Sequence, residues 1–176
     1  MEEAGLGIQG FIYQPLASAE AVLEQHEKDL GVVLVDIGGG TTDICVYFEG
    51  EVRHSAVLPI GGNSISNDIA MITQISLEDA EGIKIKYGSA KAAMASTELE
   101  FELPCKADET PRDASEHEIS RYVEARMTEI FQMVKREIER ADISNPVSFG
   151  TVLTGGGALL KNCTSLGEEI LEAQVK

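Results

Sequence analysis

Three consecutive glycines between two aspartates form the most chemically informative stretch of this chain. Gly38, Gly39 and Gly40 follow an apolar run that ends at Asp36, and Asp43 comes shortly after them. Glycines let the backbone approach an anion closely and take a positive φ, so successive N–H groups can converge on phosphate oxygens. One aspartate could orient water around Mg²⁺, and the other could polarise water near a γ-phosphate. The stretch therefore predicts a phosphate loop, with an ordinary glycine-rich hairpin as the alternative.

The residues on either side of these glycines favour two strands joined by a turn. An apolar run precedes the loop, and β-branched residues alternate from Thr42 to Phe48 after it. A P-loop would need a Gly-Lys-Ser/Thr ending that opens a helix, and a Rossmann fingerprint would need G-x-G-x-x-G before a helix. Neither pattern is present in the sequence, so both common nucleotide motifs are excluded.

A second glycine run, Gly155 to Gly157, ends another short β-branched segment and precedes a helical pattern that starts at Ala158. Without side chains at this turn, a flat base or a ribose could lie against the backbone. The second run therefore makes an ordinary hairpin a weaker explanation of the first.

Glu81 and Lys84 lie between the two glycine runs, on a predicted helix. Residues three apart share a helix face, so this pair could hold ribose hydroxyls as acceptor and donor. A solvated ion pair on a surface helix is the alternative interpretation.

The order of these motifs resembles the actin/Hsp70/sugar-kinase ATPase superfamily. The matching segments are residues 36–43 (Asp-Ile-Gly-Gly-Gly-Thr-Thr-Asp), 59–62, 81–84 and 153–158. Within that superfamily the chain is most similar to the FtsA family of bacterial division proteins, through residues 15–23, 27–31, 54–59 and 83–88. The resemblance covers nearly the whole chain.

The resemblance implies ATP and Mg²⁺ as cofactors and gives each motif a role. Asp36 would be the metal-side carboxylate, and Gln14 and Asp43 would be the candidates for positioning attacking water. Adenine would rest on Ile85, Gly88 and Gly156. The residues implied to bind the nucleotide are Gly38, Gly39, Gly40, Thr41, Thr42, Gly62, Glu81, Lys84, Gly155, Gly156 and Gly157.

The expected fold class is α/β: half of an actin-like (ribonuclease H-like) ATPase, with a mixed sheet, flanking helices and a smaller inserted α/β lobe. Residues 1–58 and 148–176 would form a discontinuous nucleotide-binding lobe, and residues 59–147 the inserted lobe. The resemblance further implies a second-half fragment that begins at the interdomain crossover and lacks the first phosphate loop. A membrane-binding tail and a polymer-contact subdomain would then lie outside the chain.

Periodicity predicts the individual elements. The expected strands are residues 8–13, 32–36, 42–48, 52–58, 98–103 and 148–153, with a tight turn at 49–51. The expected helices are residues 16–28, 66–73 with Ser64 or Ser66 as its cap, 77–87, and the longest one from Ser115. Apolar faces are expected at Leu16, Ala19, Val22 and Leu23, and at Ile119, Val123, Met127, Ile130, Val134 and Ile138. A polar stretch at 105–113 and Asn145-Pro146 would separate elements.

Composition indicates a cytoplasmic domain with one core or one core plus a small lobe. The 176 residues are 43% hydrophobic, and the formal net charge is −16. Such a surface repels nucleic acid and anionic lipid, so membrane attraction would need a segment outside this chain. Cys45, Cys105 and Cys163 are odd in number and widely spaced, which indicates reduced structural thiols and not a metal site.

The resemblance implies an ATP-dependent assembly protein with slow or absent hydrolysis. It would act at the inner face of the cell membrane at the division septum, form filaments in its full-length form, and contact the tubulin-like protein FtsZ through the inserted lobe. On its own the chain would bind ATP weakly and be inactive as an ATPase. The alternatives are a small-molecule kinase of the same superfamily, a rod-shape or pilus-assembly actin, and an adaptor lobe without nucleotide. Both intact glycine runs argue against the adaptor.

Overall fold

The computed structural model describes residues 2–105, 110–141 and 148–176. The expected break at Asn145-Pro146 and part of the polar stretch 105–113 lie outside these ranges. The strands are β1 (Val32–Ile37), β2 (Thr42–Phe48), β3 (Glu51–Leu58), β4 (Glu100–Glu102), β5 (Asp113–Ser115) and β6 (Thr151–Thr154). The helices are α1 (Gln14–Val22), α2 (Gln25–Leu30), α3 (Gly62–Thr73), α4 (Leu77–Tyr87), α5 (Glu116–Arg140) and α6 (Cys163–Leu171), with 3₁₀ turns at Glu2–Ala4, Ala92–Met94 and Gly156–Leu159.

A four-stranded mixed sheet in the order β3-β2-β1-β6 forms the centre of the larger part of the molecule. β1 pairs antiparallel with β2 and parallel with β6, and β2 pairs antiparallel with β3. The turn between β2 and β3 has positive φ at both Glu49 and Gly50, as a two-residue type I′ hairpin requires. The meander predicted from the alternating residues is therefore confirmed.

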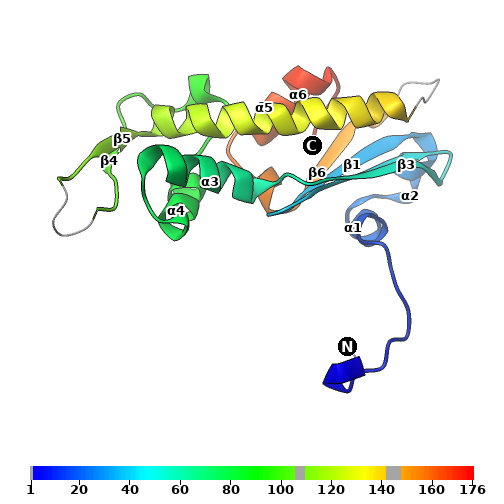
Figure 1. Ribbon diagram of the computed structural model, residues 1–176. Helices are drawn as coiled ribbons and strands as arrows, with labels where there is room; N and C mark the ends of the chain where they lie inside the picture. The colour runs from blue at the N-terminus through cyan, green and yellow to red at the C-terminus, as the bar shows by residue number, and fades with distance from the viewer. Residues whose placement is uncertain (1, 106–109, 142–147) are drawn as a thin grey trace.

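Both faces of this sheet are buried, which explains why β1 is apolar at almost every position. One face, with Val33, Val35 and Ile44, shares a core with α5 and α6. The other face, with Leu34 and Cys45, packs against Ala19 and Leu23 in the first helical segment. Figure 1 shows α5 and α6 on one side of the sheet and α1 and α2 on the other.

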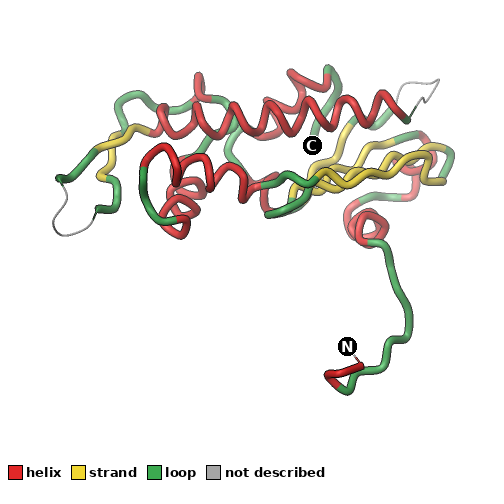
Figure 2. Tube along the Cα trace, viewed as in Figure 1, coloured by secondary structure: helices red, strands yellow, loops and turns green. Residues whose placement is uncertain are grey.

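The smaller part of the molecule contains α3, α4 and the β4–β5 hairpin, and α5 runs along both parts (Figures 1 and 2). The predicted apolar stripe of α5 is confirmed, because Ile119, Val123, Met127, Ile130 and Val134 are fully buried. Ser115 caps the helix by accepting a hydrogen bond from the backbone N–H of Glu118. A single core cluster therefore joins the sheet to the smaller part through α5. The boundary proposed at residues 59–147 stays a prediction.

The strand predicted over residues 8–13 is wrong. Residues 5–13 form neither helix nor strand and extend away from the sheet (Figure 1), with Phe11 91% exposed and Ile12 81% exposed. An apolar strand is stable only when a neighbouring strand satisfies its N–H and C=O groups. No described strand lies beside this segment, and its three glycines add conformational freedom.

The single helix predicted over residues 16–28 is two helices. Leu23 and Glu24 are extended, and Glu24 starts α2 with a capping box in which Glu24 and Glu27 bond each other's backbone N–H groups. The apolar face is therefore also only partly correct, because Ala19 and Leu23 are buried whereas Leu16 and Val22 are exposed.

The helix α3 begins four residues earlier than predicted, and neither Ser64 nor Ser66 caps it. Its N-cap residue is Gly61, which has no side chain that could accept a capping hydrogen bond. The first N–H groups of the helix are satisfied by backbone carbonyls of the first glycine run, as described below. This tertiary contact replaces a local cap.

The described residues contain no helix that is both long and apolar enough to span a bilayer. The helical pattern predicted from Ala158 is a 3₁₀ turn followed by α6, which begins only at Cys163 and packs on α5. Cys45 and Cys163 are buried free thiols, and Cys105 is an exposed free thiol.

Candidate functional site

The first glycine run forms the turn between β1 and β2, as its flanking residues predicted. The ladder ends at the Ile37–Thr42 pair, and the Gly38 N–H donates to the Thr41 carbonyl at 2.9 Å. Contrary to expectation, none of the three glycines has a positive φ. Among the described residues, the N–H groups of Gly39 and Gly40 donate to no protein acceptor. Two of the three predicted amides are thus free for a ligand.

The N-terminus of α3 is docked onto this turn. The Gly62 N–H donates to the Gly38 carbonyl at 2.9 Å, and the Asn63 N–H donates to the Gly39 carbonyl at 2.8 Å. A Cβ on Gly61 would lie 2.5 Å from the Gly38 carbonyl oxygen, so only glycine allows this approach. Close backbone contact, and not left-handed backbone geometry, is what the glycines supply here.

The second glycine run joins β6 to the 3₁₀ turn Gly156–Leu159, and its three members differ in surroundings. Gly155 has φ +83°, and a Cβ there would overlap Asp36 Oδ1 and lie 2.6 Å from the Ile37 carbonyl oxygen. A Cβ on Gly157 would overlap the Ile37 side chain. Gly156 meets nothing within 4 Å and faces open space. The outer two glycines therefore pack on the end of β1, and the middle one presents bare backbone.

The two aspartates that bracket the first glycine run lie opposite each other on β1 and β2. Directly paired residues project to the same sheet face, so both carboxylates lie on the α1 side. Asp36 accepts a hydrogen bond from Ser18 at 2.8 Å, and Asp43 accepts one from Thr41 at 3.2 Å. Gln14 is exposed at the start of α1, one helical turn before Ser18 on the same helix face.

Glu81 and Lys84 belong to a buried hydrogen-bond network that ties α4 to α3. The Lys84 ammonium donates to the Gly62 carbonyl at 3.1 Å, to Ser66 Oγ at 3.0 Å and to Glu81 Oε2 at 2.7 Å. Ser66 also donates to Glu81 Oε2. The Lys84 side chain is only 8% exposed. The solvated ion pair considered from the sequence therefore does not describe this lysine.

The Glu81 carboxylate reaches the open side of this network, with its side chain 41% exposed. Burial raises the pKa of the Glu81 carboxyl, but the hydrogen bonds from Lys84 and Ser66 outweigh burial and hold the pKa below its usual range. Because Oε2 takes both of those hydrogen bonds, Oε1 is the oxygen left to accept from a ligand hydroxyl.

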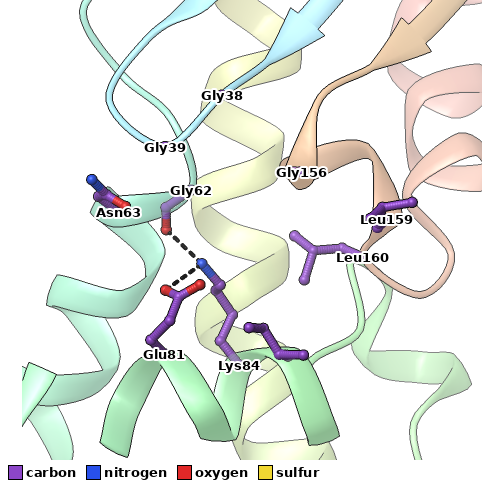
Figure 3. A pocket seen from close by; sticks show the side chains of 11 residues that line it. Gly38, Gly39, Gly62, Asn63, Glu81, Lys84, Gly156, Leu159 and Leu160 are labelled. Carbon is purple, nitrogen blue, oxygen red and sulfur yellow. Dashed lines mark hydrogen bonds and ion pairs between the residues drawn. The ribbon is translucent and has the colours of Figure 1, made fainter. Parts of the chain in front are cut away.

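Both glycine runs and the Glu81–Lys84 pair line one cavity of about 290 Å³. Figure 3 shows Gly38, Gly39, Gly62 and Asn63 on one side of it and Gly156, Leu159 and Leu160 on the other. The residues that line it are Gly38, Gly39, Gly62, Asn63, Glu81, Lys84, Ile85, Gly156, Gly157, Leu159 and Leu160. The cavity thus has a polar side at α3 and α4 and an aliphatic side at the second glycine run.

Most of the residues predicted to bind a nucleotide meet at this cavity, and several do not line it. Gly40, Thr41 and Thr42 belong to the adjoining turn and strand, where Thr42 Oγ1 donates to the Ile60 carbonyl at 2.9 Å. Gly155 packs behind the cavity on Asp36. Gly88 was expected beneath adenine, but it ends α4 and packs on Val123 and the Lys84 carbonyl, because the helix C-terminus turns toward α5.

Sequence reasoning missed three cavity-lining residues, namely Asn63, Leu159 and Leu160. Asn63 directly follows Gly61-Gly62, so its position after a glycine break was a usable signal. Leu159 is 87% exposed. The helical pattern in the sequence did not indicate this exposure, because a second leucine follows it directly.

The residues of this site fit an Mg²⁺ ion that is bound together with a nucleotide better than a metal ion that is held by protein ligands alone. No group of three or more His, Cys, Asp or Glu side chains that could hold a metal ion occurs in the described ranges. Mg²⁺ is typically bound through one or two carboxylates together with water and substrate phosphates. Asp36 is a partly exposed carboxylate at the end of β1, next to the free amides of the first turn. These residues fit such an ion.

Comparison with known proteins gave a consistent family match. The family profile for "Cell division protein FtsA" matches residues 33–176. The FtsA protein of Pseudomonas aeruginosa is 41% identical over 176 residues, which is 100% of this chain and 42% of that protein. The Escherichia coli K12 FtsA protein is 33% identical over 183 aligned positions, covering 100% of this chain and 44% of that protein. The chain thus spans less than half the length of these curated relatives.

Solved structures share the fold at lower sequence identity. MreB5 of Spiroplasma citri bound to ADP matches 99% of this chain and 56% of that one, with TM-score 0.81 and 22% identity. The PilM–PilN type IV pilus biogenesis complex matches 98% of this chain and 43% of that one, with TM-score 0.69 and 22% identity. These likenesses confirm the predicted α/β fold of an actin-like ATPase, with its mixed sheet and flanking helices.

Proposed function

This chain belongs to the FtsA family of bacterial cell division proteins, and from that membership we propose that it binds ATP with Mg²⁺ as part of an assembly protein of the division site. Family membership favours this function over the small-molecule kinase and over the rod-shape or pilus-assembly actins. Because the chain covers only 42% of the P. aeruginosa relative, activity and partners are proposed for a full-length version, meaning the chain extended to the length of that relative.

One observation carries the proposal: two glycine runs far apart in the sequence and a helix between them converge on one cavity. The first run offers the free N–H groups of Gly39 and Gly40, which suit phosphate oxygens. The second offers the bare backbone of Gly156, which suits a flat group. A site with amides at one end and aliphatic side chains at the other matches the two ends of a nucleotide.

Within this cavity we assign the ribose to Glu81 and the base to the aliphatic side. Glu81 Oε1 would accept from a ribose hydroxyl, while Lys84 holds the carboxylate through Oε2. Ile85, Leu159 and Leu160 would cover the base. Support comes from fold neighbours whose structures contain adenine nucleotides, namely MreB5 with ADP and a MamK mutant with AMPPNP.

Asp36 is the proposed metal-side carboxylate, and Asp43 and Gln14 are the candidates for positioning water. Bound Mg²⁺ would neutralise phosphate charge, which matters because the chain carries a net charge of −16. The Asp43 carboxylate shares the sheet face of Asp36, and Gln14 lies one turn of α1 from the Ser18 that contacts Asp36. Hydrolysis is expected to be slow or absent.

For the full-length version we propose filament formation, a contact with an FtsZ-like tubulin homologue through residues 59–147, and action at the cytoplasmic face of the membrane at the septum. Membrane binding would come from a segment outside this chain, and nucleic acid is not an expected partner. Exposed apolar residues on the inserted part, Met71, Ile72 and Leu77, offer contact surface. A MamK double helical filament is among the fold neighbours, with a TM-score of 0.64.

The test is an ATP titration of the full-length version with and without Mg²⁺. Asp36→Ala should abolish the strengthening of ATP binding by Mg²⁺ and leave the fold intact. Asp29→Ala is the matched control, because Asp29 is an exposed aspartate of α2 that bonds Gln25. If Mg²⁺ strengthens ATP binding to the Asp36 variant as it does to the parent, Asp36 is not the metal-side carboxylate. If the parent binds no ATP, the proposed function is wrong.

A further inference from the structure

Within the described ranges, Ser18 is the only residue of α1 whose side chain donates a hydrogen bond to Asp36, and the sequence pattern assigned no role to this serine. Its hydroxyl donates to Asp36 Oδ2 at 2.8 Å, eighteen positions away in the chain. We propose that Ser18 is a positioning residue, which fixes the Asp36 carboxylate in the orientation needed to receive Mg²⁺-bound water. The proposal rests on the proposed function, because it assigns a support to the metal-side carboxylate.

The two oxygens of Asp36 are held from different directions. Oδ2 accepts from Ser18, and Oδ1 lies against the Cα of Gly155, where any Cβ would overlap it. The backbone of Asp36 is itself fixed, because it pairs with Asp43 on one side and Thr154 on the other. The carboxylate can therefore turn only if the contact with Ser18 or with Gly155 gives way. An ionised carboxylate has about four lone-pair sites, so these contacts leave capacity for a ligand.

Ser18 can perform this role because α1 is anchored at the same place. Ala19, the next residue, is fully buried against the sheet, and Leu23 one turn later is buried in the same cluster. Pro15 lies in the first turn of α1, where its fixed φ suits a helix start. The serine hydroxyl is thus presented from a packed helix and not from a mobile loop. A donor held in this way orients its partner instead of following it.

The expected consequence is a loss of Mg²⁺ dependence and not a loss of fold. Residues that support a metal-side group typically change metal affinity by about 10–100-fold when removed. Asp36 is partly exposed, so water can replace part of the Ser18 contact. We therefore expect the lower end of that range. Ser18→Ala should reduce the Mg²⁺-dependent strengthening of ATP binding by about tenfold.

The experiment is an equilibrium titration of the full-length version with ATP, at several Mg²⁺ concentrations and in EDTA. The variants are Ser18→Ala, Ser18→Thr, Asp36→Ala and the double variant Ser18→Ala/Asp36→Ala. Ser55→Ala is the matched control, because its hydroxyl donates to Tyr13 immediately before α1 at 3.0 Å and does not touch Asp36. Thermal unfolding of each variant without nucleotide reports any change in the fold.

The proposal predicts that Ser18→Ala reduces the Mg²⁺-dependent strengthening of ATP binding (the Mg²⁺ effect) about tenfold. Ser18→Thr should retain most of this effect, and Ser55→Ala should retain all of it. The double variant should be no worse than Asp36→Ala alone. If Ser18→Ala keeps the full Mg²⁺ effect while Asp36→Ala loses it, the role of Ser18 is refuted and the proposed function stands. If Ser18→Ala weakens ATP binding equally in EDTA, the serine is structural and the proposal fails. If Asp36→Ala keeps the Mg²⁺ effect, Asp36 is not the metal-side carboxylate and the role of Ser18 fails with it. If the parent binds no ATP at all, the proposed function itself is wrong.

Discussion

Replacing Gly155 by alanine should destabilise the fold strongly, whereas the same replacement at Gly156 should leave stability almost unchanged. The two residues are neighbours in one turn, but they differ in backbone φ and in what a new methyl group would meet. At Gly155 the methyl would overlap Asp36 Oδ1 and lie 2.6 Å from the Ile37 carbonyl oxygen. At Gly156 it would meet nothing within 4 Å.

The magnitude follows from two separate costs at Gly155. Its φ of +83° with a ψ of 170° is a backbone conformation that is found essentially only at glycine, and it costs a residue with a Cβ about 1–3 kcal/mol. Forcing a methyl group into a packed site costs about 1–3 kcal/mol more. Together they reach about 2–6 kcal/mol, or a fall in Tm of about 4–24 °C for a chain of this length. For Gly156→Ala we expect a change in stability within about 1 kcal/mol.

Urea denaturation and thermal unfolding of the two variants, measured without nucleotide, check these values. The full-length version adds a functional contrast, because the Gly156 methyl would project into the cavity and should weaken ATP binding while the fold is intact. A Gly155→Ala protein with the stability of the parent would refute the packing of this turn on β1. A Gly156→Ala protein as unstable as Gly155→Ala would refute it equally.

Three further predictions concern the Glu81–Lys84 network. Glu81→Ala in the full-length version should weaken ATP binding by about 1–2 kcal/mol, as expected for one or two hydrogen bonds, and an unchanged Kd in a titration would exclude a ribose contact. Lys84→Met should lower the free energy of unfolding by about 1–3 kcal/mol, because Gly62 and Ser66 lose a buried donor. Urea denaturation measures this loss, with Lys86→Met at an exposed position as the control. If the two variants are equally stable, the prediction is wrong. Because the folded pKa of Glu81 is lowered, its contribution to stability should be complete above about pH 4.3, the unfolded value, and lost as pH falls through the folded pKa. Glu81→Gln should remove this loss of stability at low pH from a plot of unfolding free energy against pH. A variant plot identical to that of the parent would rule out the contribution of Glu81.

Local patterns were sufficient to predict the elements that are stabilised within one continuous stretch. The β1–β2–β3 meander and α4 follow from alternation and helix periodicity, and α5 follows from its apolar stripe and the Ser115 cap. The convergence of both glycine runs with Glu81 and Lys84 on one cavity was inferred from motif order together with the family resemblance. The signals for the individual elements are carried by residues that are close in sequence, whereas the convergence joins motifs that are far apart in the chain and needed the resemblance.

The features that sequence missed depend on contacts between distant segments. The early start of α3 depends on carbonyls of Gly38 and Gly39, more than twenty positions away, and no local cap marks it. The irregular conformation of residues 8–13 depends on the lack of a strand neighbour in the described ranges, although their apolar pattern is that of a strand. The Ser18–Asp36 contact is likewise invisible in either local sequence.

A crystal structure of the full-length version with Mg²⁺ and a non-hydrolysable ATP analogue tests the central claim most directly. The proposal predicts phosphate oxygens at the N–H groups of Gly39 and Gly40, a ribose hydroxyl at Glu81, and the base against Ile85 and Leu159. A nucleotide bound away from this cavity, or bound in it with the base at the first glycine run, would contradict the account.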